Sequence, residues 1–551
     1  MLRTISTGLL ALAAAAVPSA GQAVLQKLTA SDSSFGHWYG LSVSVDGGFA
    51  AVGDPRFITG PQGRVHVYRL QGNDWLADDV VTAPGGHAAD AFGFAVDVDD
   101  AFGIERLVVG AELFGAPANE KGKAFVYRRQ LNLFPNPPSW ELESELVSPF
   151  ALSQFTRFGA SVAIDGGRAV VGAPREDLSF QDMGVIFLYR LEAGGWVIDD
   201  VIAAPDAVDD ALFGQAVDLR GDTVYVGAPG ANGASAGSGA AYVYRHDGSG
   251  WNLEQKIVAP GGSDGDFFGA SLSASATRLL VGATRPGQSG RAYVFRRQLN
   301  LFPTPPSWEH DATLAPGDGQ DFDRFGASVS LDGSDITGFT AVVGAPHHDG
   351  AAQNTGAAYV FASSGGWHQT AELEAFDGQS NDSFANSVSH DGDVALAGSP
   401  FANSGVVGDT GAAYSYALDD PALGADVPQL SVSLGGTQNL ALNAGAAHVG
   451  KVYLVLGTVS GTTPGSPFLN VQVPLNSDPY FDFTLGNPSV PPLVHTIGLL
   501  DAPGGTDAAG FVLPPASSPN LVGLVVHHAF VVFGSGPIDL VSNAARLEFT
   551  P

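Results

Sequence analysis

Phe158-Gly159-Ala160-Ser161-Val162, followed by Val170-Val171-Gly172-Ala173-Pro174, is the clearest copy of a pattern that occurs seven times along this chain of 551 residues. The pattern begins with a Phe-Gly pair and ends in Gly-Ala-Pro or a close variant. Its first landmark falls at Gly36, Gly93, Gly159, Gly214, Gly269, Gly326 and, in the seventh unit, Ala385. Subtraction of neighbouring residue numbers gives steps of 57, 66, 55, 55, 57 and 59 residues. Repetition at such a period is typical of one supersecondary unit that has been copied.

Each unit carries signals for four β-strands. The residues after Phe-Gly alternate between polar and apolar, and the run before Gly-Ala-Pro is apolar. A third segment, such as Ala241-Tyr242-Val243-Tyr244, is aromatic and β-branched. A tryptophan begins the fourth segment in six units: Trp75, Trp140, Trp196, Trp251, Trp308 and Trp367. Because radially repeated four-stranded sheets form a β-propeller, the sequence predicts an all-β fold with a seven-bladed propeller over residues 24–418.

The seventh unit lacks both the tryptophan and a fourth strand. The start of the chain offers a match, because Gln26-Lys27-Leu28-Thr29-Ala30 resembles Gln255-Lys256-Ile257-Val258-Ala259 of the fourth unit. We therefore expect residues 24–30 to pair with the strand at 411–416. A propeller closed by its N-terminal strand would leave no unpaired sheet edge at this point.

These landmarks resemble the FG-GAP repeat, which is known from the seven-bladed head of integrin α subunits and from many secreted bacterial proteins. The resemblance covers residues 24–418 and implies calcium, held by an Asp-x-Asp-x-Asp-Gly loop between the first two strands of a blade. This chain departs from that loop. Hairpins such as Asp165-Gly166-Gly167 are too short to surround a cation with six or more oxygens. The longer Asp97–Asp100 and Asp332–Asp335 lack the expected order of ligands. We therefore expect no cofactor, and the alternative is calcium in one of the two longer loops.

The ends of the chain predict export and a second domain. Residues 1–23 are typical of a signal peptide, with Arg3, an apolar stretch over 9–17 and a small-residue cleavage site at 21–23. The chain has no cysteine, which excludes disulfides. Residues 419–428 are interpreted as a linker. Short apolar or alternating runs over 429–551, among them 468–473 and 480–483, predict the strands of a C-terminal β-sandwich. We expect a secreted protein of a bacterial type, extracellular or at the cell surface.

Charge directs attention to the loops that lead into each Phe-Gly pair. The formal net charge of −31 argues against nucleic acid or an anionic membrane as the main partner. The candidate ligand-binding residues in these loops are Asp90, Asp209, Asp210, Asp264, Asp266, Asp321, Asp323 and Asp382. A ring of such carboxylates could dock a cationic ligand, or each aspartate could cap its own turn. His347-His348-Asp349 could offer metal ligands, but a solvated loop is the preferred interpretation. Arg220-Gly221-Asp222 is interpreted as a tight turn.

Catalytic signals are thin. The sequence shows no cysteine nucleophile, no Gly-x-Ser-x-Gly elbow, no phosphate-binding glycine loop and no His-Glu-x-x-His pair. We therefore name no catalytic residue and no metal ligand. The preferred hypothesis is an exported, non-enzymatic binding or adhesion protein that presents propeller loops to an extracellular protein or glycan. The alternative is a propeller enzyme that acts on extracellular polysaccharide or lipid.

Overall fold

The structure is a computed structural model. Between residues 24 and 418 it describes all residues except 31–35, 57–61, 72–73, 88, 101–102, 116–120, 132–137, 151–154, 286, 299–305, 351, 364–365, 376 and 404–409. Beyond residue 418 it describes the strands, one helix and the short segments that flank them. The signal peptide predicted at 1–23 lies outside the described residues. No helix among the described residues is long and apolar enough to cross a membrane.

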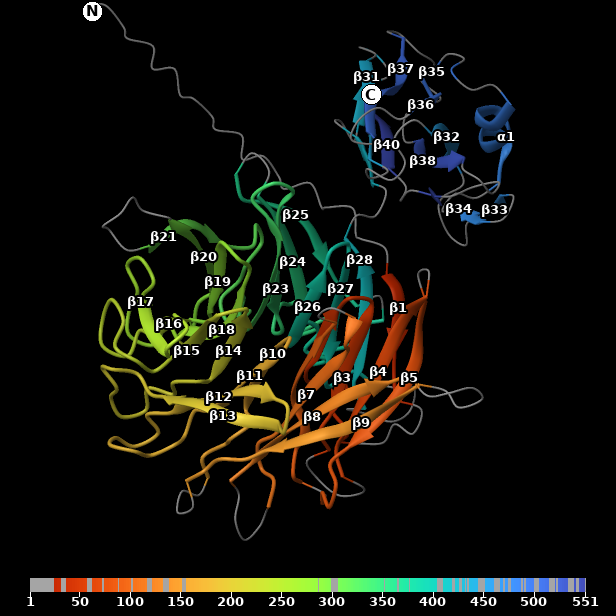
Figure 1. Ribbon diagram of the computed structural model, residues 1–551. Coiled ribbons are helices and arrows are strands. Elements are labelled where there is room, and N and C mark those ends of the chain that lie inside the picture. The colour runs from red at the N-terminus through yellow and green to blue at the C-terminus, as the bar shows by residue number, and fades with distance from the viewer. Residues whose placement is uncertain are drawn as a thin grey trace, which may run out of the picture.

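Seven four-stranded antiparallel sheets are arranged around a central axis and form a seven-bladed β-propeller (Figure 1). The four landmarks of each repeat correspond to the four strands of one blade. Blade one consists of β2 (Val43–Asp46), β3 (Phe49–Asp54), β4 (Arg64–Gln71) and β5 (Asp74–Thr82), and blade two consists of β6 (Phe92–Asp99), β7 (Arg106–Ala111), β8 (Lys123–Gln130) and β9 (Ser139–Leu146). Blade three consists of β10 (Ser161–Asp165), β11 (Arg168–Ala173), β12 (Val185–Glu192) and β13 (Gly195–Ile202), blade four of β14 (Ala216–Arg220), β15 (Thr223–Ala228), β16 (Ala240–His246) and β17 (Trp251–Ile257), and blade five of β18 (Phe268–Ala274), β19 (Arg278–Ala283), β20 (Arg291–Gln298) and β21 (Ser307–Leu314). Blade six consists of β22 (Ser328–Ser334), β23 (Gly338–Ala345), β24 (Ala357–Ala362) and β25 (His368–Leu373), and blade seven of β26 (Ser387–Asp391), β27 (Val394–Ser399), β28 (Ala412–Ala417) and β1 (Val24–Leu28).

The last blade takes its outer strand from the start of the chain. β1 pairs antiparallel with β28, so that Lys27 lies opposite Tyr414 and Leu28 lies opposite Ala413. Gln26 donates from Nε2 to the carbonyl of Trp75 and accepts the Trp75 N–H, at 3.2 and 2.7 Å. In blade four Gln255 makes the same pair of bonds to Trp308, at 3.0 and 2.7 Å. The similarity between residues 26–30 and 255–259 thus reflects one structural role.

The core lies between blades, where their faces pack together. Ile186 of β12 packs with Val226 of β15 and Tyr242 of β16, and every side chain in this cluster is buried. The glycine of each Gly-Ala-Pro landmark permits this approach. A Cβ added at Gly172 would overlap the carbonyl oxygen of Gly214 in the next blade. The corresponding overlap at Gly398 would be with Gly40 of blade one, so the seam that closes the ring is packed like the others.

The contact at Gly40 corrects the predicted position of the first Phe-Gly landmark. Gly36 was expected to mark blade one, but Tyr39-Gly40 occupies the Phe-Gly position. The Gly40 N–H donates to the Gly53 carbonyl at 2.9 Å, as that of Gly159 does to Gly172. Tyr39 and Phe158 are both fully buried. A buried aromatic ring followed by glycine is the physical requirement at this position, and tyrosine meets it as well as phenylalanine.

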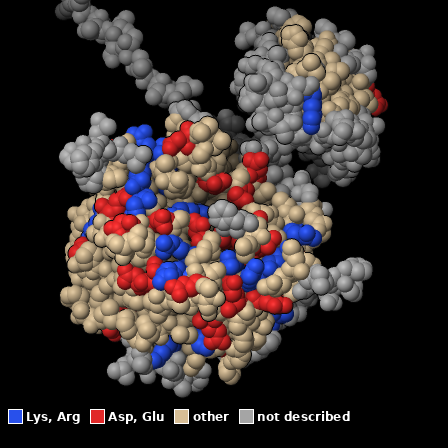
Figure 2. All heavy atoms as spheres, viewed as in Figure 1, with Lys and Arg blue, Asp and Glu red and all other residues tan. Residues whose placement is uncertain are grey.

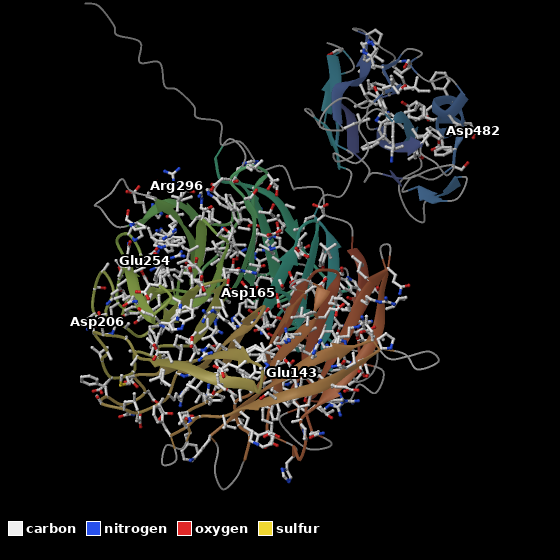
Figure 3. The ribbon with its side chains drawn as sticks, in the orientation of Figure 1. Glu143, Asp165, Asp206, Glu254, Arg296 and Asp482 are labelled. Atoms are coloured by element: carbon white, nitrogen blue, oxygen red, sulfur yellow. The ribbon has the colours of Figure 1, made fainter. Side chains whose placement is uncertain are left out.

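The first strand of each blade is a sheet edge that faces the central channel, and in most blades a side chain of the preceding blade accepts one of its N–H groups. In blade four the N–H of Leu219 donates instead to Asp218 of its own strand, at 2.7 Å. The N–H of Ile164 donates to Asp97 Oδ2 at 2.8 Å, and the N–H of Leu331 donates to Ser273 Oγ at 3.0 Å. Two residues further along the first strand, a carboxylate accepts an N–H from the hairpin that joins the first and second strands of the next blade. These carboxylates are Asp46, Asp99, Asp165, Asp332 and Asp391. Figure 3 shows Asp165 near the middle of the ring.

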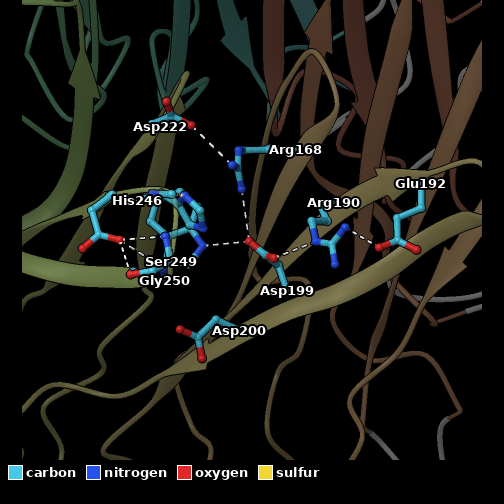
Figure 4. Close-up of polar contacts among 12 residues, drawn as sticks. Arg168, Arg190, Glu192, Asp199, Asp200, Asp222, His246, Ser249 and Gly250 are labelled. Atoms are coloured by element: carbon cyan, nitrogen blue, oxygen red, sulfur yellow. Dashed lines mark hydrogen bonds and ion pairs between the residues drawn. The ribbon is translucent and has the colours of Figure 1, made fainter.

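The tryptophan of the fourth strand joins blades near the periphery. Trp251 Nε1 donates to Asp199 Oδ2 of the preceding blade at 2.9 Å, and Arg190 and Arg168 also contact this carboxylate (Figure 4). Equivalent bonds run from Trp140 to Asp78, Trp196 to Glu143, Trp308 to Glu254 and Trp367 to Asp311. Trp75 donates instead to Ser415 Oγ of the last blade, at 2.8 Å. A side-chain bond from the indole to the neighbouring blade explains why a tryptophan recurs in the repeat.

The C-terminal part contains two main sheets. One consists of β29 (Ala422–Ala425), β31 (Gly436–Asn443), β37 (Gly505–Leu513) and β35 (Leu493–Val494). The other consists of β30 (Gln429–Ser431), β40 (Ala545–Thr550), β38 (Val525–Phe533), β32 (Val452–Thr458) and β36 (Ile497–Leu499), with β39 (Leu540–Val541) paired to β38. Phe511 of the first sheet and Phe549 of the second belong to one buried cluster. β29 lies inside the segment 419–428 that was predicted to be only a linker.

Two strand predictions in this part are wrong. Residues 480–483 belong to helix α1 (Pro479–Gly486) and not to a strand. Asp478 caps this helix by accepting the Phe481 N–H at Oδ1, at 2.8 Å, and Pro479 follows at the first helical position. The run 468–473 is a hairpin of β33 (Ser466–Phe468) and β34 (Val471–Val473). In both cases the turn or cap residues outweigh the apolar alternation.

Candidate functional site

The loop face is the propeller face formed by the loops that join the fourth strand of one blade to the first strand of the next, here called inter-blade loops, and by the loops between second and third strands. Each inter-blade loop has two residues with left-handed backbone conformation. The residue two before the Phe-Gly glycine has positive φ in all seven loops: Trp38, Ala91, Arg157, Leu212, Phe267, Arg324 and Ser383. The residue four before it also does: Gly36, Ala89, Phe155, Asp210, Gly265, Phe322 and Asn381.

Hydrogen bonds between blades hold these conformations. The N–H of Asp210 donates to the Gln181 carbonyl in the preceding blade at 2.8 Å. The N–H of Phe322 donates to the Gln288 carbonyl at 3.0 Å, in the same relation. The loop face is therefore built on a hydrogen-bonded backbone frame that repeats around the ring.

Bulky apolar side chains project from this frame. Phe155 is 59% exposed, Phe322 is 66% exposed and Phe267 is 37% exposed. Leu178 and Phe180, in the loop between β11 and β12, are also exposed on this face. Left-handed conformation costs an L-residue about 1–2 kcal/mol. For Phe155 and Phe322 the burial that could offset this cost is small, because most of each ring faces solvent.

The structure divides the eight aspartates of the inter-blade loops into two groups. Asp90, Asp266, Asp323 and Asp382 occupy one register, three residues before the landmark glycine or Ala385, and all four are buried. Each accepts the N–H of the residue three positions earlier, as Asp266 Oδ2 does from Ser263 at 2.8 Å. For these four residues the structure has the turn-capping arrangement, and their carboxylates are not on the surface.

The remaining four aspartates are exposed. Asp209, Asp264 and Asp321 occupy one register, five residues before the glycine, and Asp210 lies next to Asp209. One oxygen of Asp209 accepts the Gln181 N–H at 2.9 Å. Asp264 lies in the same loop as Phe267, and Asp321 lies in the same loop as Phe322. In the view of Figure 2, acidic and basic residues are interspersed over the molecule.

The opposite mouth of the central channel is also acidic. A cavity of about 210 Å³ is lined there by Asp46, Asp97, Asp99, Asp218, Asp332, Asp391 and Arg220, among others. Burial raises the pKa of Asp97 to about 7, and burial also raises the pKa of Asp218. The negative charge of Asp218 is the main cause that raises the pKa of the Arg220 guanidinium. Arg220 therefore partly compensates a concentration of negative charge at this mouth.

These carboxylates do not fit the calcium loop that the family implies. In the described hairpins the oxygens of Asp46, Asp165 and Asp391 accept N–H groups of the next blade. An oxygen bound in this way points along the ring and not into a loop of its own. Arg220-Gly221-Asp222 lies in the hairpin of β14 and β15, as a tight turn, with Arg220 directed to the channel.

The expectation of a solvated loop at His347-His348-Asp349 is wrong for His348. Its side chain is 5% exposed, and its Nδ1 lies 3.1 Å from Oδ2 of the buried Asp323. The residue four positions after the landmark glycine of the second strand is Ala231 in blade four and Ala402 in blade seven, and both are buried. A buried histidine at this position was missed because the surrounding letters are typical of a loop.

Comparison with known proteins follows the same repeats. The FG-GAP repeat profile matches residues 24–68, 152–189, 196–244, 251–295, 308–361 and 367–416, which together span just over half of the chain. No curated protein matches the chain. Among solved structures, Sqt1 from Chaetomium thermophilum is 12% identical, with 69% of this chain and 83% of that chain covered and a TM-score of 0.40. Chaetomium thermophilum Sqt1 bound to the N-terminus of the ribosomal protein L10 is 13% identical, with 68% and 86% covered and a TM-score of 0.39. The chain belongs to the FG-GAP repeat family, and its repeats form a seven-bladed β-propeller.

Proposed function

We propose that this protein is an exported, non-enzymatic binding or adhesion protein and that its loop face engages an extracellular protein. The observation that carries the proposal is the exposure of Phe155 and Phe322 at left-handed positions. Blade five has Gly265 at the same register, where φ is also positive and the strain is absent. Bulky rings held at an energetic cost, without matching burial, are typical of functional surfaces.

The neighbouring charges indicate the chemistry of the partner. Asp209, Asp264 and Asp321 are exposed on the loops that lead into blades four, five and six. A protein segment that carries an apolar side chain beside lysine or arginine would complement a surface of phenylalanine and carboxylate groups. The hydrogen-bonded frame of the loops would keep the binding surface ordered before the partner arrives, which lowers the entropy cost of binding.

The proposal is tested by selection of displayed random peptides on the full chain, in parallel with a glycan array. We expect enriched peptides to combine basic and apolar residues. Phe155→Ala with Phe322→Ala should weaken their binding about 10-fold or more, since exposed aromatic anchors contribute on the order of 1–2 kcal/mol each. Neutralisation of Asp209, Asp264 and Asp321 to asparagine should mainly reduce the association rate at low salt.

A matched control removes three carboxylates from the opposite face, by Glu192→Gln, Asp222→Asn and Asp335→Asn. This variant loses the same formal charge and should retain binding. Equal loss of binding in the control would show that net charge, and not the loop face, attracts the peptides. Glycan binding that depends on the two phenylalanines, without peptide enrichment, would overturn the choice of a protein partner.

A further inference from the structure

Blade six contains a polar cluster that the proposed loop-face function does not use. His348 lies between β23 and β24, Asp318 lies in the inter-blade loop before β22, and Glu372 lies on β25. His348 Nε2 is 3.6 Å from Glu372 Oε1 and 3.9 Å from Asp318 Oδ2. The three ligand atoms all lie within 4.8 Å of one another.

The orientation of His348 directs its Nε2 towards the two carboxylates. Nδ1 is 3.1 Å from Asp323 Oδ2, so the proton on Nδ1 is donated to that acceptor. In the neutral ring Nε2 then presents a lone pair. The distances from Nε2 to both carboxylates exceed a hydrogen bond. An Nε2 lone pair that faces two carboxylates would be stabilised by a cation bound between the three groups.

Blades four and seven show how the ring otherwise supplies that cation. In blade four Asp206 accepts from Tyr242 at 2.8 Å and pairs with Lys256. In blade seven Asp377 accepts from Tyr414 at 2.7 Å and pairs with Lys27 at 2.6 Å. Each lysine lies directly opposite its tyrosine across the third and fourth strands.

Blade six keeps the tyrosine and the aspartate but replaces the lysine. Tyr359 donates to Asp318 at 3.1 Å, and the residue opposite Tyr359 is Glu372. The ammonium group of the other two blades is therefore exchanged for a carboxylate, and the buried alanine is exchanged for His348. One positive charge is lost while one negative charge and one imidazole are gained at the same place.

We propose that blade six binds a divalent transition-metal ion of the Zn²⁺ type through His348 Nε2, Asp318 and Glu372. One imidazole and two carboxylates are a donor set suited to Zn²⁺, whereas Ca²⁺ takes six or more oxygens. Asp323 and Tyr359 would orient two of the ligands from outside the metal's own coordination shell. Asp318 and His348 lie in loops of the loop face, but none of the three ligands is among the residues proposed to contact the protein partner.

Titration calorimetry of the chelator-treated full chain with ZnCl₂ tests the proposal. The chain has 13 histidines, so the informative quantity is the difference between variants. Glu372→Lys restores the arrangement of blades four and seven, and His348→Ala restores their alanine. Each variant should bind one Zn²⁺ fewer, or bind it at least 100-fold more weakly, and Glu372→Lys should keep the melting temperature. X-ray absorption spectroscopy at the zinc edge of the wild-type protein should show one imidazole ligand among oxygen ligands.

Two further variants make the test stricter. Lys256→Glu in blade four should create no site, because Ala231 leaves that blade without a histidine. Ala402→His combined with Lys27→Glu should create a second site, because blade seven already has Asp377, Tyr414 and the buried Asp382. Unchanged zinc binding in Glu372→Lys and His348→Ala would overturn the proposal. Binding of Ca²⁺ in preference to Zn²⁺ would also overturn it.

Discussion

Replacement of Phe322 by glycine should give a more stable protein than its replacement by alanine, which is the reverse of the usual order of these two residues. In an ordinary backbone conformation glycine is less stable than alanine by about 0.5–1 kcal/mol, because the unfolded chain gains freedom. At Phe322, where φ is 76°, an L-residue carries a strain of about 1–2 kcal/mol that glycine does not. Phe322→Gly should therefore be more stable than Phe322→Ala by about 0.5–1 kcal/mol.

The exposed ring sets the comparison with wild type. Full burial of a phenylalanine contributes about 1.5–3 kcal/mol. Phe322 is 66% exposed, so roughly a third of that value, about 0.5–1 kcal/mol, is lost on truncation. Phe322→Ala should be destabilised by this amount, since the strain remains. In Phe322→Gly the relief of strain nearly cancels the losses of ring burial and chain entropy, so its stability should be close to that of wild type.

Blade five provides the reverse substitution. Gly265 has φ of 75° and open space where a Cβ would lie, so Gly265→Ala adds strain without a steric clash. It should destabilise the protein by about 0.5–1 kcal/mol. Differential scanning calorimetry would measure the melting temperatures of all three variants. The melting temperature is expected to shift by about 1 °C per kcal/mol for a propeller of this size.

Equal stability of the two Phe322 variants, or a more stable alanine variant, would refute the strain argument. Destabilisation of Phe322→Gly by more than about 2 kcal/mol would refute it in another way, because the ring would then be shown to pack. Either result would also remove the main support for a ligand-binding role of the exposed phenylalanines.

Three other perturbations test the packing and the charges of the ring. Gly172→Ala should destabilise by more than about 4 kcal/mol in urea unfolding, because the new Cβ would overlap the next blade, whereas Gly167→Ala, with its nearest contact at 3.7 Å, should cost under about 1 kcal/mol. Burial lowers the pKa of His390 to about 4, so the folded state disfavours its charged form and stability should fall as pH drops from about 6.5 towards 4; His390→Leu should flatten urea midpoints over this window. Burial alone would raise the pKa of Glu254, but bonds from two arginines and a tryptophan lower it, so its contribution should be full above about pH 5 and lost as pH falls through the lowered pKa. Glu254→Gln should weaken this acid dependence, and an unchanged acid-unfolding curve would contradict its role.

The repeat registers allowed the blades to be predicted because each landmark has one physical task. The glycine of Gly-Ala-Pro is needed wherever the backbone of the next blade approaches, and the tryptophan is needed wherever a carboxylate of the preceding blade must be bonded. Each task falls at the same position of every repeat, so it leaves a regular pattern in the sequence. The error at Gly36 arose where an aromatic residue other than phenylalanine, Tyr39, performs the task.

The site could be predicted only in part, since burial depends on contacts between blades. Asp264 and Asp266 are two residues apart in one acidic loop, yet the first is exposed and the second is buried. Their difference comes from the two left-handed residues in each loop, which turn the backbone. A left-handed conformation cannot be recognised from the sequence when the residue is phenylalanine or aspartate and not glycine. His348 was missed for a related reason, because its partners Asp318 and Glu372 are distant in the sequence.

The pairing of Lys27 with Tyr414 has a consequence for the order of folding. The strand synthesised first has its partner in the strand of the propeller that is synthesised last. Six blades can form from neighbouring segments, but the seventh cannot be completed until nearly the whole propeller sequence is available. The late step closes a very long loop, which slows folding more than it affects stability. Until then β28 presents an unpaired edge, so truncated chains without residues 24–28 should be unusually prone to associate.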